Sequence, residues 1–246
     1  GNIYLYIEKI KVIMDKQKLN GFIDKYTLGG NVESVKWKVS EKDMQTNFVS
    51  DDKTLLGNIK YKGIGFREGE YCVYTTSQFK KLINVLDTDI DIVVNHKDGR
   101  NYSVGMRDKF TQLEYVLSEE SIIPKAPKLK QIPDFTVSIE IDGDFIMRFL
   151  KAKAALSDQT NFTVMYDDLS EFTSIMIGYS ESMVTNKISF EVKSTNDQQD
   201  ELDPISFSAD HLKEILLANR DMTSGILEVS PAGLAKVTIK GPEFES

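Results

Sequence analysis

The feature that most constrains the fold is a weak internal repeat. The segments TTSQFKKLINVLD from 75 and SADHLKEILLANR from 208 share a start rich in Ser and Thr, a lysine and the same apolar spacing. Lys80 and Lys213 are 133 residues apart, and the turn residues Gly99 and Gly233 are 134 apart. IKVIMDKQKLNGFI from 10 overlays VSIEIDGDFIMRFL from 137 in the same way, with Asp15 and Asp142 as expected helix N-caps. We therefore predict two copies of one domain, each built as strand, helix and three strands, repeated.

Apolar residues at i, i+3 and i+4 predict four amphipathic helices, over 16–26, 75–86, 145–157 and 208–220. The intervening segments alternate or are rich in β-branched residues, which predicts a dozen or more strands. Short turns such as Asp98-Gly99 join them, as in antiparallel meanders, whereas a parallel sheet would need a helix after nearly every strand. The expected fold class is α+β, with two similar domains that each pack two helices on antiparallel sheets.

A segment rich in proline separates the two copies. Pro124, Pro127 and Pro133 lie in a stretch without periodicity, which is typical of an interdomain crossover. The predicted boundaries are an N-terminal domain over 1–118, a crossover over 119–134 and a C-terminal domain over 135–246.

The repeat leaves the second copy one strand short, because only two strands fit between the helix at 208 and the final GPEFES. The alternating segment IYLYIE, residues 3–8, is a surplus strand at the other end. One hypothesis is that it pairs beside 235–240 and closes the second domain, as in a circular shift of the chain order. The alternative is that residues 3–14 form one long first strand, or include sequence foreign to the natural chain before Met14.

Composition argues against a membrane or secreted protein. No run of 18 apolar residues exists, and the first residues lack the pattern of a secretory signal, so we expect a cytoplasmic protein. The single cysteine, Cys72, fits a reducing compartment and excludes an internal disulfide. We expect it to be a buried strand residue.

The residues that chemistry needs are scarce. His96, expected in a hairpin turn, and His211, expected at a helix start, are the two histidines, and neither a nucleophile elbow nor Cys/His metal spacing occurs. GIGFREG from 63 has Glu68 where a dinucleotide loop needs its third glycine. DTDID from 87 has Ile92 where a calcium loop needs glycine. We therefore expect no enzyme, no metal site and no cofactor.

Charge is distributed unevenly along this chain, whose net charge is −8. The four helix windows hold ten basic and three acidic residues, so the remainder carries a net charge of −15. On a helical wheel, lysines and arginines of the first three helices lie away from the apolar stripe, whereas in the fourth Glu214 shares its outer face with Lys213. Simple solvation of lysines is the alternative interpretation for any one helix. If the helices share a face, that face is a basic lining that attracts phosphates, and the opposite face is acidic.

With this layout the chain resembles the DNA sliding clamps, above all the trimeric clamp of T-even-type bacteriophages, and more distantly proliferating cell nuclear antigen. The likeness is carried by YCVYTTSQFKKLINVLDTDIDIVV, the crossover SIIPKAPKLKQIP and SFSADHLKEILLANRDMTSGILEV. It implies a homotrimeric ring around duplex DNA, bound without sequence specificity and closed by pairing FTQLEYVL (110–117) of one subunit with NKISFEV (186–192) of the next. The side chains expected to face DNA are Lys18, Lys25, Lys80, Lys81, Arg148, Lys151 and Lys213.

The resemblance also implies partners, namely a replicative DNA polymerase and an ATP-driven clamp loader that dock hydrophobic peptides between the domains. The candidate groove residues are Ile122, Ile123, Leu234 and Ala235. The predicted function is thus a processivity factor. Two alternatives remain open: a monomeric processivity factor of the same fold, which should show a basic exterior, and a phage structural or assembly protein rich in antiparallel sheet.

Overall fold

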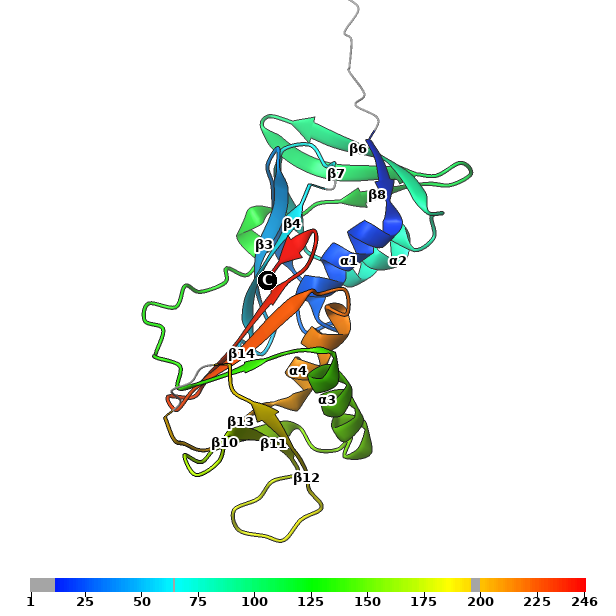
Figure 1. Ribbon diagram of the computed structural model, residues 1–246. Coiled ribbons are helices and arrows are strands. Elements are labelled where there is room, and N and C mark those ends of the chain that lie inside the picture. The colour runs from blue at the N-terminus through cyan, green and yellow to red at the C-terminus, as the bar shows by residue number, and fades with distance from the viewer. Residues whose placement is uncertain (1–11, 64, 196–199) are drawn as a thin grey trace, which may run out of the picture. The chain divides into compact units, whose positions relative to one another are not determined.

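The chain forms two compact units, residues 1–127 and 128–246. The structure is a computed structural model that describes residues 12–63, 65–195 and 200–246 (Figure 1). The boundary between the units falls inside the proline-containing segment 119–134. The hypothesis about residues 3–8 lies outside the described residues.

Unit 1 contains two four-stranded antiparallel sheets, with strand orders β1-β6-β7-β8 and β5-β2-β3-β4. Its elements are β1 (Val12–Asp15), α1 (Lys16–Thr27), β2 (Val35–Val39), β3 (Asp43–Val49), β4 (Leu56–Lys62), β5 (Gly69–Val73), α2 (Thr76–Ile83), β6 (Asp89–Lys97), β7 (Arg100–Arg107), β8 (Gln112–Val116) and the 3-10 turn η1 (Glu120–Ile122).

Unit 2 repeats this topology, with strand orders β9-β14-β15-β16 and β13-β10-β11-β12. Each strand takes the place of its counterpart in unit 1, so the predicted α+β fold of two similar domains with two helices each is confirmed. The elements are β9 (Val137–Glu140), α3 (Gly143–Ala155), β10 (Asn161–Tyr166), β11 (Phe172–Ile177), β12 (Ile188–Lys193), β13 (Leu202–Ser208), α4 (Ala209–Ala218), β14 (Ser224–Ser230), β15 (Leu234–Lys240) and β16 (Phe244–Glu245).

The expectation that the second copy lacks its last strand is wrong. The strand is β16, which has two residues and pairs Glu245 with Lys240 of β15. Gly241 N–H donates to the Phe244 carbonyl at 2.8 Å and closes the turn between the two strands. Two residues are too few to show the alternation by which a strand is recognised in a sequence.

The helices begin where their capping residues predict. The Asp15 carboxylate accepts a hydrogen bond from Gln17 N–H at 2.8 Å at the start of α1, and Asp142 accepts one from Phe145 N–H at 2.8 Å at the start of α3. Both side chains satisfy backbone donors that have no partner inside the helix. The expected N-caps are therefore both present.

In unit 1 the helices are held to the sheet by buried aromatic side chains. Phe22 of α1 meets Trp37 of β2 edge to face, with ring centroids 5.4 Å apart. The Tyr26 hydroxyl contacts Thr76 Oγ1 at 2.8 Å and accepts a hydrogen bond from Trp37 Nε1 at 3.3 Å. Burying each such ring contributes roughly 1.5–3 kcal/mol, and the hydroxyl joins α1, α2 and β2.

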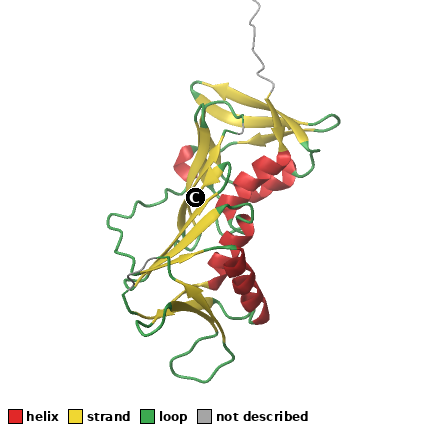
Figure 2. Cartoon of the chain, viewed as in Figure 1, coloured by secondary structure: helices red, strands yellow, loops and turns green. Residues whose placement is uncertain are grey.

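In unit 2 a buried cation joins the two helices. Phe145 and Phe149 of α3 face the core, and Phe149 packs edge to face on Phe162 of β10. Lys153 Nζ, near the end of α3, donates to the Ser157 carbonyl at 2.8 Å and lies 3.1 Å from Asp210 at the start of α4. Within each unit the two α-helices lie together on one side of the strands, as Figure 2 shows.

Candidate nucleic-acid interface

The outward face of α1 and α2 carries fewer exposed cations than the sequence suggests. Lys18 and Lys81 are exposed, as predicted. Lys80 is half-buried and forms an ion pair with Asp24 of α1. Lys25 is only 3% exposed, so its place among the outward-facing residues is a correction. A lysine beside an apolar stripe can bury its aliphatic stem, and a wheel does not show how far the neighbouring strands cover it.

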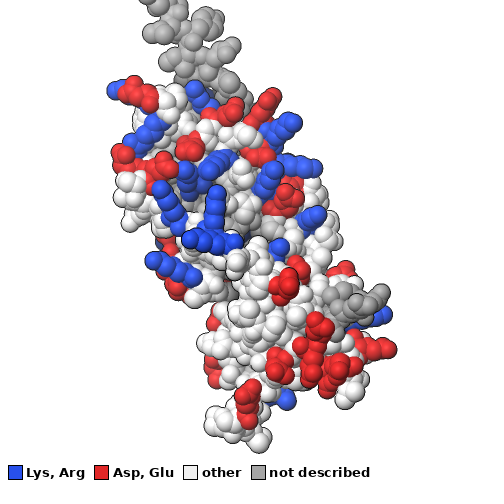
Figure 3. Space-filling model, turned by 90° about the vertical axis from the view of Figure 1, so that its left-hand side faces the viewer, with Lys and Arg blue, Asp and Glu red and all other residues white. Residues whose placement is uncertain are grey.

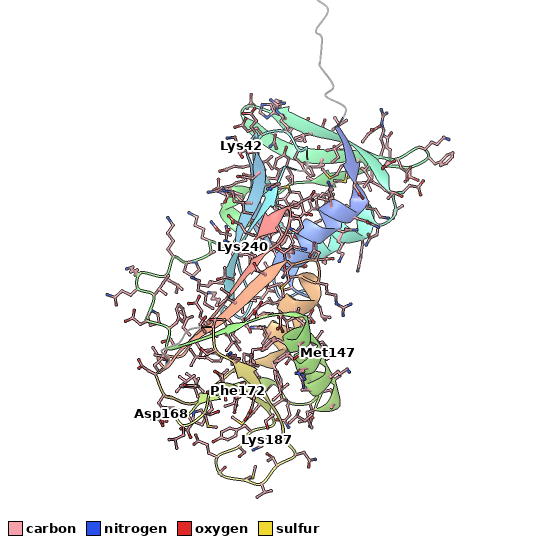
Figure 4. All side chains as sticks on the ribbon, in the orientation of Figure 1. Lys42, Met147, Asp168, Phe172, Lys187 and Lys240 are labelled. Atoms are coloured by element: carbon pink, nitrogen blue, oxygen red, sulfur yellow. The ribbon has the colours of Figure 1, made fainter. Side chains whose placement is uncertain are left out.

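In unit 2 the exposed cations come from α3. Arg148 and Lys151 are exposed, and Arg148 Nε lies 2.9 Å from the Asp144 carboxylate one turn earlier. Met147 is exposed on the same helix, where Figure 4 shows it pointing away from the strands. Lys213 of α4 is half-buried. The outward face of unit 2 is therefore weakly basic and partly neutralised.

The excess of basic over acidic residues is smaller on the observed helices than in the helix windows predicted from the sequence. The four helices contain nine basic and four acidic residues. The difference arises partly at Asp144, because α3 begins at Gly143, two residues before the predicted window. Lysines and arginines still outnumber carboxylates on the helices, and the excess lies on α1, α2 and α3.

A second basic surface lies on the outer face of the sheet β5-β2-β3-β4, the face of the sheet turned away from the core. Lys36 and Lys38 alternate with buried residues on β2, as Lys60 and Lys62 do on β4. Figure 3 shows Lys and Arg side chains gathered on this side of unit 1. The expectation that everything outside the helices is acidic is therefore wrong for this sheet. The signal was present in VKWKV and NIKYK, whose alternating lysines share one face of a strand.

Each unit leaves one strand at the edge of a sheet that matches a predicted joint. β8 ends the order β1-β6-β7-β8, and β12 ends the order β12-β11-β10-β13. Leu117 N–H donates inward to the Tyr102 carbonyl, so the N–H of Val116 points away from β7. The Val116 side chain is 72% exposed. An edge of this kind can accept a further strand.

The residues proposed for a peptide groove are placed differently within their units. Ile122 is exposed on η1, whereas Ile123 is buried. Leu234 and Ala235 are half-buried at the start of β15. In unit 2 an open hollow brings Leu234 together with Ile132, a 58% exposed residue that the sequence analysis missed. Its full lining is Gln131, Ile132, Pro133, Asp134, Ala232, Gly233 and Leu234.

Groups that could perform chemistry are separated from one another. Within the described ranges, no three His, Cys, Asp or Glu side chains lie close enough to hold a metal ion. His96 is a strand residue of β6, not a turn residue, because Asp98 and Gly99 make the turn with positive φ. Cys72 is a strand residue as predicted but only half-buried, and burial raises the pKa of its thiol. No helix in the described part of the chain is both long and apolar enough to span a membrane.

Comparison with known proteins finds similarity in structure alone. No protein-family model matches the sequence, and the sequence matches no curated protein. Many solved structures are similar to the chain, and three of them illustrate the likeness. A structure of the C-terminal region of FEN-1 bound to A. fulgidus PCNA matches with a TM-score of 0.70 and 15% identity, over 96% of this chain and 94% of that one.

Proliferating Cellular Nuclear Antigen from Entamoeba histolytica matches with a TM-score of 0.67 and 10% identity, over 96% of both chains. The DNA polymerase sliding clamp from Bacillus subtilis matches with a TM-score of 0.67 and 15% identity, over 100% of this chain and 65% of that one. At these identities the likeness concerns the fold.

Proposed function

Starting from the sliding-clamp fold, we propose that this chain is a DNA sliding clamp that encircles duplex DNA and tethers a replicative DNA polymerase. The observation that carries the proposal is the set of exposed cations on helices of both units, Lys18 and Lys81 in unit 1 and Arg148 and Lys151 in unit 2. Contacts from such side chains to phosphates are independent of sequence and sensitive to salt, which suits a protein that must slide. The role is one of binding, not catalysis, and a cytoplasmic location goes with it.

The proposed ring is a homotrimer like the clamp of T-even-type bacteriophages, joined by pairing β8 of one subunit with β12 of the next. The two edge strands described above support this arrangement, because a head-to-tail contact uses a different edge on each side of the subunit. We expect a mass of about three times 27.9 kDa in solution. A sedimentation experiment at several concentrations measures it.

Val116→Pro tests the joint while keeping the hydrogen bonds of β8 to β7. Proline removes only the outward N–H of Val116 and leaves the inward hydrogen bond from Leu117 N–H in place. We expect the variant to sediment as a folded monomer, while Val116→Thr, which keeps the N–H, assembles like the parent. A trimer that survives Val116→Pro would rule out this edge as the joint.

Encirclement is tested by topology. A closed ring that is loaded on circular DNA should be retained at a salt concentration that removes it from the same DNA after linearisation, because it slides off free ends. We expect polymerase on the circular template to synthesise longer products with the protein and a clamp loader than without them. Equal retention on circular and linear DNA would contradict encirclement.

The partner site of the proposal is the hollow in unit 2. Ile132, Pro133 and Leu234 offer apolar contacts to a short hydrophobic peptide of the polymerase or the clamp loader. This proposal keeps Leu234 and replaces Ile123, whose side chain is buried, with Ile132. Ile132→Asp should abolish polymerase stimulation, whereas the ring should still assemble.

A second candidate is a monomeric processivity factor that binds DNA on its exterior. The lysines on the outer face of β2 and β4 favour it, since such a protein needs a basic outer surface. Sedimentation and the retention experiment together separate the two candidates. A monomer that binds linear and circular DNA equally well fits only the second.

A further inference from the structure

The outer face of the sheet β5-β2-β3-β4 presents cations in an ordered array. Gln45 of β3 is the register partner of Lys38 on one side and of Lys60 on the other. Neighbouring strands lie about 4.8 Å apart. Lys38 and Lys60 therefore lie on either side of the Gln45 amide, and their backbones are separated by roughly twice that distance. Lys36 lies two residues before Lys38 on β2, and Lys62 lies two residues after Lys60 on β4, so both are on the same face of the sheet.

A hollow of about 210 Å³ opens where the segment 120–126 runs beside this face. It combines ammonium groups with apolar surface from one short stretch of chain. Its lining residues are Lys36, Lys38, Asn47, Glu120, Ile123, Pro124, Lys125 and Ala126.

The lysines of the hollow differ in their partners. Lys36 Nζ lies 2.7 Å from Glu120 and 3.6 Å from Glu70, and its hydrogen bond to Glu120 raises its pKa. Lys38 and Lys125 make no ion pair within the described part of the chain, although both act with Lys36 to lower the pKa of Glu120. Lys36 is thus engaged in holding η1 against β2, whereas Lys38 and Lys125 can accept an anion from outside.

The lining favours a peptide over a nucleic acid. Pro124 and Ala126 supply apolar contacts beside the ammonium groups, and none of the lining residues is aromatic, so no side chain of the hollow can stack on a base. The carboxylates of Glu70 and Glu120, which pair with Lys36, and of Asp43, which pairs with Lys60, interrupt the basic surface and weaken its attraction for a continuous phosphate backbone. A peptide can place its carboxylates at the lysines and leave other positions uncharged.

We propose that this surface, formed by the hollow and by Lys60 and Lys62 beside it, docks an acidic segment of a partner protein. Carboxylates of the segment pair with Lys38 and Lys125, and an apolar side chain between them packs on Pro124 and Ala126. The proposal is independent of encirclement, because every residue involved belongs to unit 1.

The test uses fluorescence anisotropy with the full chain and three probes of equal length. They are a labelled peptide with a few Asp and Glu residues on either side of one central Leu and uncharged residues elsewhere, the same peptide with Lys in place of the acids, and oligo-dT. We expect the acidic peptide alone to bind. Lys38→Glu combined with Lys125→Glu should weaken that binding by at least about tenfold, because each reversal sets like charges against each other.

The matched control is Lys97→Glu combined with Lys109→Glu, which reverses two exposed lysines elsewhere in unit 1 and should bind like the parent. Ala126→Glu, which places a carboxylate in the hollow and keeps all lysines, should also weaken peptide binding. Trp37 emission checks that each variant is folded. Equal losses in the control, or no binding of the acidic peptide, would overturn the proposal. Binding of oligo-dT that depends on Lys38 and Lys125 would assign the surface to nucleic acid instead.

Discussion

Removing the partner of the buried cation in unit 2 should cost more stability than removing the cation itself. The side chain of Lys153 is 6% exposed, and that of Asp210 is 54% exposed. Asp210→Asn leaves the ammonium buried against the Ser157 carbonyl with no opposite charge. Breaking a fully buried pair costs roughly 3–5 kcal/mol, but half-exposure of Asp210 screens the interaction, so we expect about 1–2 kcal/mol.

Lys153→Met should cost less, below about 1 kcal/mol, because the variant keeps the aliphatic stem and leaves only groups that water can reach. Asp210 would then be solvated, and the exposed residue Ser157 could bond its carbonyl to water.

Urea unfolding followed by far-ultraviolet circular dichroism measures the two variants against Asp203→Asn, an exposed control in unit 2. The only tryptophan, Trp37, lies in unit 1 and monitors that unit separately. We expect the order Asp210→Asn, then Lys153→Met, then the control. If Lys153→Met proves the more destabilising substitution, the ion pair does not act as described.

Three further outcomes are expected. The pKa of Cys72 is raised first by burial and next by the charge of Glu120, so Glu120→Gln should lower it. Iodoacetamide should then react with the Cys72 thiol faster at pH 8 in this variant than in the control Glu68→Gln. An unchanged pH–rate profile would contradict this. The Asp108 carboxylate accepts three backbone hydrogen bonds that depress its pKa below its ordinary value, so its contribution to stability is present at neutral pH and lost in acid. The stability difference between the parent and Asp108→Ala should therefore shrink as the pH falls from 7 to about 3, and a constant difference would refute it. The triple variant Lys81→Ala, Arg148→Ala and Lys151→Ala should bind DNA more weakly than the parent. The slope of log affinity against log salt concentration should become shallower by about 0.9 for each phosphate that the variant no longer neutralises. An unchanged slope would place the DNA elsewhere.

Local rules predicted the helices well. α1 occupies Lys16–Thr27 against an expected 16–26, because an apolar stripe and the Asp15 cap act within the segment itself. The duplication of the topology could be predicted for the same reason, since each copy repeats its own turns and caps. β16 could not, because two residues carry no period.

The charge map was harder to predict, because burial depends on neighbours that are distant in sequence. Lys25 is buried although the wheel places it beside the apolar stripe of α1, whereas Lys153 falls within the stripe of α3 and is buried there. Counting charge by segment also averaged the lysines of β2 and β4 with acidic loops. Considering each strand face separately would have distinguished Lys36 and Lys38 from those loops.

The two copies of the topology differ on the outer faces of their sheets. Where β2 and β4 expose lysines, the corresponding sheet of unit 2 exposes Glu191 and Lys193 on β12 and Asp203 on β13, so it has no excess of cations. An acidic ligand that is attracted to the first face therefore gains no comparable attraction at the second. Titration to saturation should therefore count one such ligand for every polypeptide, half the number that the pseudo-symmetry of the backbone would allow.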